Sequence, residues 1–231
     1  MIMWIKFYKY FSNLLSLPIF FFFLIRLFLS KETISSICEK FSFYYKKRPK
    51  GDLIWINAVS IGESKTGIII AKEIKKIKPN SKILLTTTTL TAYKLLSEKN
   101  SEFLIIFFPL DIHFVVRRFL EHWKPSSAIF VESEVWPNIL YLLKQKSIKL
   151  SIFNGRISQK SFENWRRVSF FSQSIFSLIS QCFVQDNDSL RRFKILGVRQ
   201  ASKIENLKFL SKNLEVDEII FNKLSSQLKL K

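Results

Sequence analysis

The sequence predicts an α/β protein in which helices cover both faces of a parallel sheet. Short, almost continuously apolar runs recur from residue 52 onward, amphipathic helical stretches separate them, and polar residues follow most of the runs. Strands that are apolar on both sides suit a sheet buried between two helical layers. In such sheets the ligand-binding residues lie at the carboxyl ends of the strands, where strand meets helix.

The elements can be placed in order along the chain. The predicted strands are LIWIN (53–57), KILLTT (82–87), FLIIFF (103–108), SAIFVES (127–133), SIKLSIF (147–153) and CFVQ (182–185). The predicted helices are 62–78, ended by Pro79-Asn80, one near 91–98, 111–123, one beginning near Val135, one from about Ser158, and 186–196. Residues 52–210 therefore form one α/β domain, and 211–231 a Lys-rich helix or tail. The GxGxxG and Walker A patterns are absent, which argues against a typical dinucleotide or P-loop domain.

An apolar run, LLSLPIFFFFLI (14–25), precedes the α/β series. Extended to Leu29 it reaches 16 residues, near the lower limit for crossing a bilayer. It has no polar face, so residues 1–30 are predicted to be an uncleaved membrane anchor, either a short transmembrane helix or one seated in the interface. The next segment, 31–51, is basic, and the positive-inside rule places the α/β domain on the cytoplasmic side.

The chain of 231 residues carries a formal net charge of +19. Nucleic-acid binding, an anionic membrane surface and a compositional bias toward Lys could each account for it. The basic residues are spread along the chain without a zinc, basic-region or RRM-like pattern, so a membrane-facing surface is favoured and no nucleic-acid partner is expected. Cys38, Cys182, His113 and His122 form no cluster, so neither a metal site nor a disulfide framework is predicted.

Several predicted strands end in residues that could bind or transform a ligand. Ser60, Gly62 and Glu63 follow the first strand, and a run of four threonines (86–89) ends the second. Asp111 follows the third strand, Glu132 and Glu134 the fourth, and Arg156 the fifth. Together they predict a binding cleft at one edge of the sheet. Taken singly, Glu63, Thr91 and Asp111 could equally be helix-start residues, and Pro137 a helix-entry proline.

These runs occur in an order that resembles a known family. NAVSIGES, TTTT, PLD, VESEVWPN, NGRIS and ENLKF are similar to HAVSVGE, TTTTPTG, PLD, ETELWPN, NARLS and GNLKFD of bacterial Kdo (3-deoxy-D-manno-octulosonic acid) transferases. The resemblance implies that residues 52–210 are the Rossmann-like, acceptor-binding N-terminal domain of a GT-B glycosyltransferase. It also implies transfer of Kdo from CMP-Kdo to a lipid A precursor in lipopolysaccharide biosynthesis, at the cytoplasmic face of the inner membrane.

The resemblance also implies roles for individual residues. Glu63 would be the general base, and Glu132 and Lys208 would stabilise the transition state. Ser60, Gly62, Glu134 and Arg156 would bind substrate. The family is not known for an obligatory metal, and no cofactor is expected, since CMP-Kdo is a donor substrate. A carboxylate at a helix N-terminus is favoured in its ionised form by about 0.3–1 kcal/mol.

Family members continue into a second Rossmann-like domain, which is expected to be absent from a chain that stops at Lys231. The sequence thus predicts a truncated enzyme that is inefficient alone, with the second domain possible on a separate chain. The alternative is a non-catalytic membrane-bound protein that binds anionic lipid or a partner subunit through its basic face.

Overall fold

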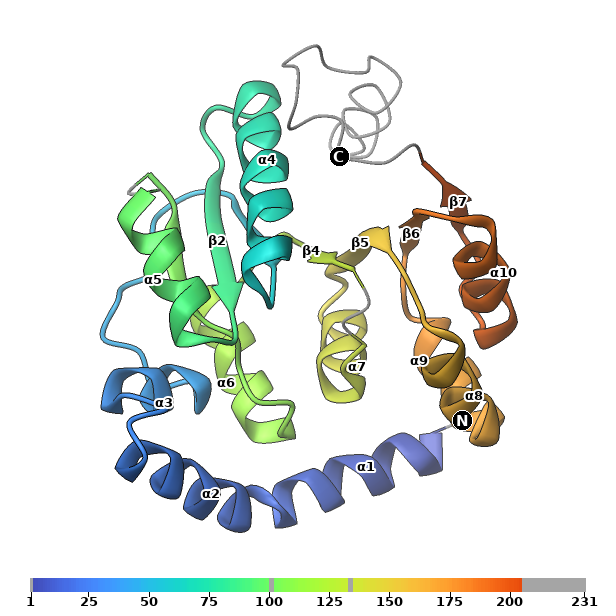
Figure 1. The fold of residues 1–231 in the computed structure, drawn as a ribbon, viewed down its shortest axis with the longest axis horizontal. Coiled ribbons are helices and arrows are strands. Elements are labelled where there is room, and N and C mark those ends of the chain that lie inside the picture. Colours follow the sequence, from blue (N-terminus) through green and yellow to red (C-terminus); the bar gives the residue numbers. More distant parts are fainter. Residues whose placement is uncertain (1, 100–101, 133–134, 205–231) are drawn as a thin grey trace.

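A single sheet organises the chain in the computed structural model, which describes residues 2–99, 102–132 and 135–204. Its strand order is β3-β2-β1-β4-β5-β6-β7, and all of the neighbouring strands pair in parallel (Figure 1). The strands are β1 (Leu53–Asn57), β2 (Lys82–Thr87), β3 (Leu104–Phe107), β4 (Ser127–Val131), β5 (Lys149–Gly155), β6 (Gln181–Val184) and β7 (Ala201–Lys203). The predicted Rossmann-like parallel sheet is therefore confirmed.

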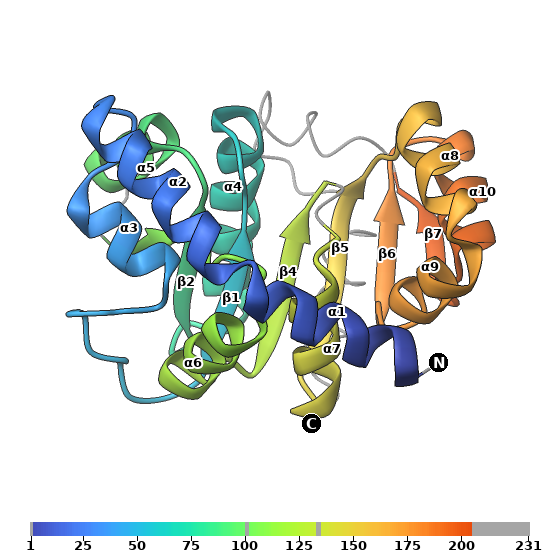
Figure 2. The same cartoon turned by 90° about the horizontal axis from the view of Figure 1, so that it is seen from below.

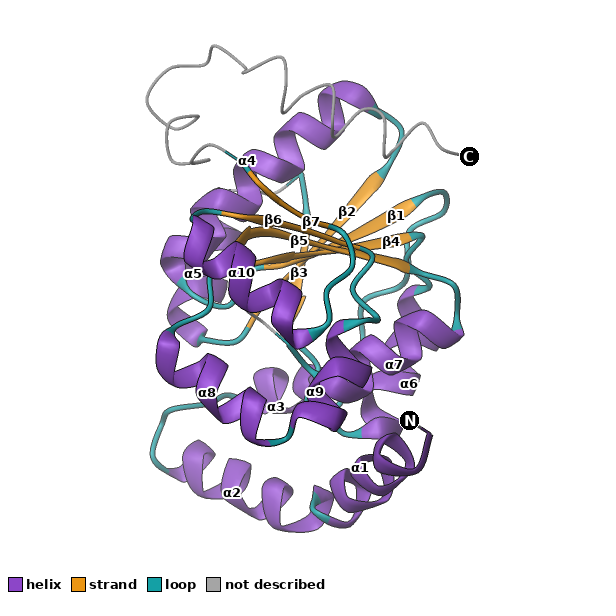
Figure 3. Ribbon diagram, turned by 90° about the vertical axis from the view of Figure 1, so that its right-hand side faces the viewer, coloured by secondary structure: helices purple, strands orange, loops and turns teal. Residues whose placement is uncertain are grey.

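Helices cover both faces of this sheet. They are α4 (Ile61–Ile77), α5 (Leu90–Lys99), α6 (His113–Trp123), α7 (Pro137–Gln145), α8 (Gln159–Arg167), α9 (Ser169–Phe176) and α10 (Asn187–Leu196). Because side chains alternate along a strand, Ile54 and Ile56 face α4 and α5, whereas Trp55 packs with α6 on the opposite face. Figure 3 shows α4 above the sheet and α6 and α7 below it.

Three features differ from the sequence prediction. The helix expected to begin at Asp111 begins at His113, and the helix expected from about Ser158 is divided into α8 and α9 at Val168. The strand β7 was not predicted, because three residues are too few to carry an alternation pattern.

The predicted anchor is two helices, α1 (Ile2–Leu14) and α2 (Ser16–Phe28), with a bend of 47° between them. Pro18 explains the break, since it cannot donate to the carbonyl of Leu14 and its ring would clash with that group in a continuous helix. Among the described residues no single helix is long and apolar enough to cross a bilayer, although the bent pair would qualify by length and composition. The two helices run diagonally across the α6–α7 side of the sheet (Figure 2).

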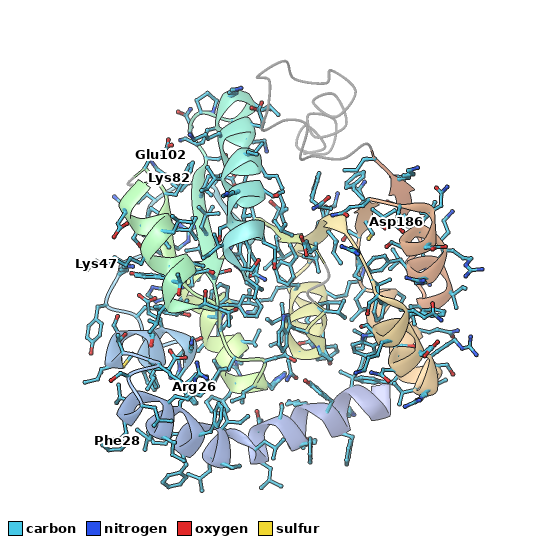
Figure 4. All side chains as sticks on the ribbon, viewed as in Figure 1. Arg26, Phe28, Lys47, Lys82, Glu102 and Asp186 are labelled. Atoms are coloured by element: carbon cyan, nitrogen blue, oxygen red, sulfur yellow. The ribbon has the colours of Figure 1, made fainter. Side chains whose placement is uncertain are left out.

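The outer face of this helix pair is apolar and exposed. Its exposed large side chains are Phe7, Tyr10, Phe11, Leu14, Leu17, Phe20, Phe21, Phe22, Ile25, Phe28 and Leu29. The inner face is fixed to the domain, where Phe23 is buried and its ring lies 6.0 Å from that of Phe41. Figure 4 shows Phe28 directed away from the domain and Arg26 directed toward it.

The segment after α2 contains buried charges. Lys40, at the end of α3 (Ile34–Lys40), lies 2.5 Å from the carboxylate of Glu32, and both side chains are almost fully enclosed. Glu39 accepts a hydrogen bond from the Phe107 N–H (2.9 Å) and lies 3.5 Å from Lys46. Part of the basic charge in residues 31–51 is therefore paired with buried carboxylates of the same segment, and Glu39 attaches α3 to β3.

Candidate active site

The strand order places the candidate site between β1 and β4. The chain moves outward from β1 to β2 and β3, then returns to set β4 on the other side of β1. Open α/β sheets bind their ligands at such a reversal, in the crevice outside the carboxyl ends of the two strands that flank it, which here are β1 and β4. Glu63 lies in the first turn of the helix that follows β1, and Glu132 directly follows β4. Two of the acids that the sequence singled out therefore come from the strands flanking the crevice.

Glu63 is held in place by its own helix start. Its backbone N–H donates to Oγ of Ser60, the N-cap residue, at 3.3 Å. Its Oε2 accepts a hydrogen bond from the Val59 N–H at 3.0 Å. This is a variant of the capping box, in which the third helical residue reaches back past the N-cap. The helix-start interpretation of Glu63 is confirmed, and the same contact fixes the carboxylate at the crevice.

Glu132 adopts a left-handed backbone conformation, with φ of 65°. Its N–H donates to the Phe153 carbonyl of β5 at 2.8 Å, so the strained residue is still hydrogen-bonded to the sheet. Asn154, the residue after Phe153 on β5, is also left-handed, with φ of 59°. A non-glycine residue in this region costs on the order of 1–3 kcal/mol and is common at functional sites. The ends of β4 and β5 thus turn together beside the crevice.

Of the remaining predicted site residues, the structure describes Arg156 and Gly62. Arg156 follows β5, the next strand beyond β4, and is exposed. Gly62 lies in the first turn of α4, where an added Cβ would meet only the Ser60 Oγ, at 3.9 Å. Glu134 and Lys208 lie outside the described residues. Within the described ranges, no group of three or more His, Cys, Asp or Glu could hold a metal ion.

The main contact that the sequence did not predict joins the PLD and WPN motifs. Asp111 does not cap its own helix, and instead accepts hydrogen bonds from the N–H groups of Asn138 (3.2 Å) and Ile139 (2.9 Å) at the start of α7. The Asn138 amide donates to the Asp111 carbonyl at 2.6 Å and to Ser12 Oγ at 3.0 Å. Pro137, at the first position of α7, is the helix-entry proline expected.

Asp111 also attaches the N-terminal helix. The Tyr8 hydroxyl of α1 donates to its Oδ2 at 3.0 Å, across 103 residues of sequence. One carboxylate therefore links α1, the β3–α6 loop and the segment that follows Glu132. The sequence signal for this cluster was the presence of an acid and an amide in two family motifs, but nothing in the sequence paired them.

Asp111 should make the free energy of unfolding depend on pH. Burial raises its pKa from 3.8 to about 6, against the Asn138 and Ile139 N–H groups and the Tyr8 hydroxyl, which lower it. The folded chain therefore binds this proton more tightly than the unfolded chain. Its contribution, at most about 3 kcal/mol, is fully present below about pH 4 and is lost as the pH rises to about 6.

Urea unfolding at about pH 4 and above about pH 6 should show this fall for the wild type and a smaller one for Asp111→Asn. Asp188→Asn, which changes a carboxylate with a side chain 72% exposed, is the control and should keep the wild-type dependence. Equal pH dependence of Asp111→Asn and the wild type would contradict the assignment.

The fold and the site define the class as a Rossmann-like α/β domain with two carboxylates at its switch point. Residues 35–211 match the family model of 3-deoxy-D-manno-octulosonic-acid transferase (kdotransferase), and the chain belongs to that family. The resemblance found in the sequence motifs is thereby confirmed.

Relatives of the same name are similar over most of this chain. It is 35% identical over 224 residues to the 3-deoxy-D-manno-octulosonic acid transferase of Rickettsia bellii, covering 96% of this chain and 53% of the relative. It is 38% identical over 177 residues to that of Rickettsia typhi (76% and 38%) and 29% identical over 163 residues to that of Haemophilus influenzae (70% and 38%). The chain thus spans about half the length, or less, of these relatives.

Proposed function

We propose that this chain is the acceptor-binding half of an inverting GT-B glycosyltransferase, which moves Kdo from CMP-Kdo to a hydroxyl of a lipid A precursor in lipopolysaccharide biosynthesis. The observation that carries the proposal is Glu63. In a chain of the Kdo transferase family, its carboxylate is held by the Val59 N–H at the switch point of the sheet, beside the end of β4.

In this mechanism Glu63 removes the proton from the attacking sugar hydroxyl. One of its oxygens accepts from Val59, and within the described residues no Lys or Arg forms an ion pair with it. Glu132 is the transition-state stabiliser at the adjacent strand end, and Ser60, Gly62 and Arg156 border the acceptor. The roles of Lys208 and Glu134 follow from their motifs alone.

The same proposal places the domain at the cytoplasmic face of the inner membrane, with α1 and α2 lying in the interface. Three observations support an in-plane arrangement. The outer face of the pair is apolar, while on its inner face Tyr8 binds Asp111 of the domain and Arg26 binds Glu32. Lys6, Lys9 and Lys31 add positive charge near this face, which would attract anionic lipid headgroups.

The test of the function is a transfer assay with CMP-Kdo and a lipid A precursor. We expect the 231-residue chain alone to transfer Kdo inefficiently, because a GT-B reaction needs two domains closing around both substrates. Adding, as a separate polypeptide, the half of the Rickettsia bellii relative that this chain does not match should restore transfer. Robust transfer by the chain alone would contradict the need for a second domain, and no transfer by the pair would contradict the function.

A second candidate is a non-catalytic membrane-bound protein that binds anionic lipid or a partner subunit. The exposed apolar face of α1 and α2 and the net charge of +19 favour it over other non-enzymatic functions. It predicts vesicle binding that survives every substitution at the crevice, together with no transfer by the reconstituted pair.

Glu132→Gly separates strain from function at the end of β4. Glycine adopts the left-handed conformation without a Cβ penalty, so the stability should stay within about 1 kcal/mol of the wild type while transfer by the reconstituted pair falls. The matched control is Lys124→Gly, which relieves a φ of 44° at an exposed position after α6. It should leave transfer unchanged, and equal transfer by both variants would remove Glu132 from the mechanism.

A further inference from the structure

A cationic cavity lies at the neighbouring strand end, where α2 and α3 meet the loop that follows β2. Its volume is about 520 Å³. The residues that line it are Phe22, Phe23, Arg26, Lys31, Glu32, Lys40, Thr88, Thr89, Leu90 and Thr91. Thr88 and Thr89, the last two residues of the threonine run singled out in the sequence, therefore face the N-terminal helices, and the mechanism above leaves them unused.

The cavity carries a net charge of +2, from three cations and one carboxylate. Glu32 is satisfied from within, because Lys40 contacts its Oε1 at 2.5 Å, Arg26 contacts the same oxygen at 3.3 Å, and Ser36 Oγ donates to its Oε2 at 2.6 Å. Lys31 is exposed, and its ammonium group has no hydrogen-bond or ion-pair partner in the part of the chain that the structure describes, although its backbone N–H donates to the Arg26 carbonyl at 2.9 Å. An anion bound in addition to Glu32 would meet the free Lys31 ammonium. It would also meet the Arg26 guanidinium and the Lys40 ammonium, which Glu32 holds in place.

Neutral donors converge on the same space. Thr89 caps α5, accepting from the Ala92 N–H at 3.2 Å, so the first N–H groups of this ten-residue helix open beside the cavity. The hydroxyls of Thr88 and Thr91 form no hydrogen bond within the described ranges and are exposed. Hydroxyls, helix N–H groups and cations together are the donor set that binds phosphate.

The neighbouring surface indicates what carries the phosphate. Phe22 lines the cavity and is 54% exposed, and it continues into the apolar outer face of α2. A ligand held here would have its anionic group between Lys31 and the threonines, and an apolar portion along α2.

We propose that this cavity binds a phosphomonoester, presented by a lipid headgroup at the membrane surface. Identifying that headgroup as a phosphate of the acceptor glycolipid rests on the proposed function, whereas the phosphomonoester site does not. Through this site α2 would position the acceptor relative to the crevice as well as hold the domain at the membrane.

The test compares vesicle binding of the full chain to phosphatidylcholine containing phosphatidic acid, a phosphomonoester, or phosphatidylglycerol, a phosphodiester, with the surface charge matched. The wild type should prefer the phosphatidic acid vesicles, and Lys31→Gln combined with Thr91→Val should weaken that binding roughly tenfold or more. Binding of the double variant to phosphatidylglycerol should fall by no more than the loss of one surface lysine causes in Lys47→Gln. Lys47→Gln, an exposed lysine of the same basic segment that does not line the cavity, is the control and should keep the preference.

Inorganic phosphate distinguishes the two sources of the group. If inorganic phosphate binds the detergent-solubilised chain, and binds the double variant more weakly, the phosphate chemistry is supported. If phosphate binds in this way but the wild type shows no preference for phosphatidic acid vesicles, the lipid headgroup as its source is overturned. Equal binding to both vesicles without phosphate binding, or a preference that the double variant retains, overturns the site. Loss of Kdo transfer does not enter this test, so the proposed function and the phosphate site can fail independently.

Discussion

Glu63→Gln is expected to lower the rate of Kdo transfer by the reconstituted pair by about 10²–10⁴-fold, the usual contribution of a general base. The amide is nearly isosteric, and its oxygen can still accept the Val59 N–H that holds the carboxylate at 3.0 Å. The start of α4 should therefore stay intact, and the loss should reflect the missing proton acceptor. The loss should appear in kcat, because the Glu63 carboxylate acts on the reacting hydroxyl.

The measurement is initial-rate transfer with CMP-Kdo and the lipid A precursor at saturating acceptor, accompanied by thermal unfolding of each variant. Glu102→Gln is the matched control, since Glu102 is exposed, precedes β3 and lies at the periphery of the domain (Figure 4). It should leave the rate unchanged. A Glu63→Gln enzyme with the wild-type rate would reduce Glu63 to a helix-capping residue.

The strand pattern and the strand-end acids could be predicted because both are local in sequence. LIWIN is apolar at every position but the last, and the structure buries all five residues of β1. Ser60 and Glu63 lie three residues apart, the spacing of a capping box, so the helix start could be located before its hydrogen bonds were known. The switch point followed only once the strand order was known, because periodicity does not determine which strands are neighbours.

The remainder depends on contacts between distant segments. Tyr8 and Asp111 are separated by 103 residues, and neither local sequence indicates the other. Glu132 has no compositional mark of its left-handed backbone, since such strain is imposed by the surrounding sheet. Lys40 belongs to a basic segment by composition, yet folding encloses it with Glu32. Charge counting alone therefore overestimates how much of this segment is available to a membrane.

Lys40→Met is expected to lower the free energy of unfolding by about 3 kcal/mol, because it leaves Glu32 charged in a site where its side chain is 2% exposed. Arg26 and Ser36 still contact that carboxylate, which places the cost at the low end of the range for a broken buried pair. Urea unfolding would measure it. Glu32→Gln combined with Lys40→Met should recover most of the loss, since no charge then remains buried without its partner.

This variant also separates two views of the segment after α2. If Lys40 were one of several solvated lysines that attract anionic lipid, Lys40→Met would change the stability by no more than about 0.5 kcal/mol and would mainly weaken vesicle binding. Lys47→Met, at an exposed position in the same segment, should behave in that way. A loss of stability confined to Lys40→Met would mean that the ion pair, with Arg26 on the same carboxylate, holds α3 against the end of α2. The orientation of the phosphate cavity would then depend on the same contact.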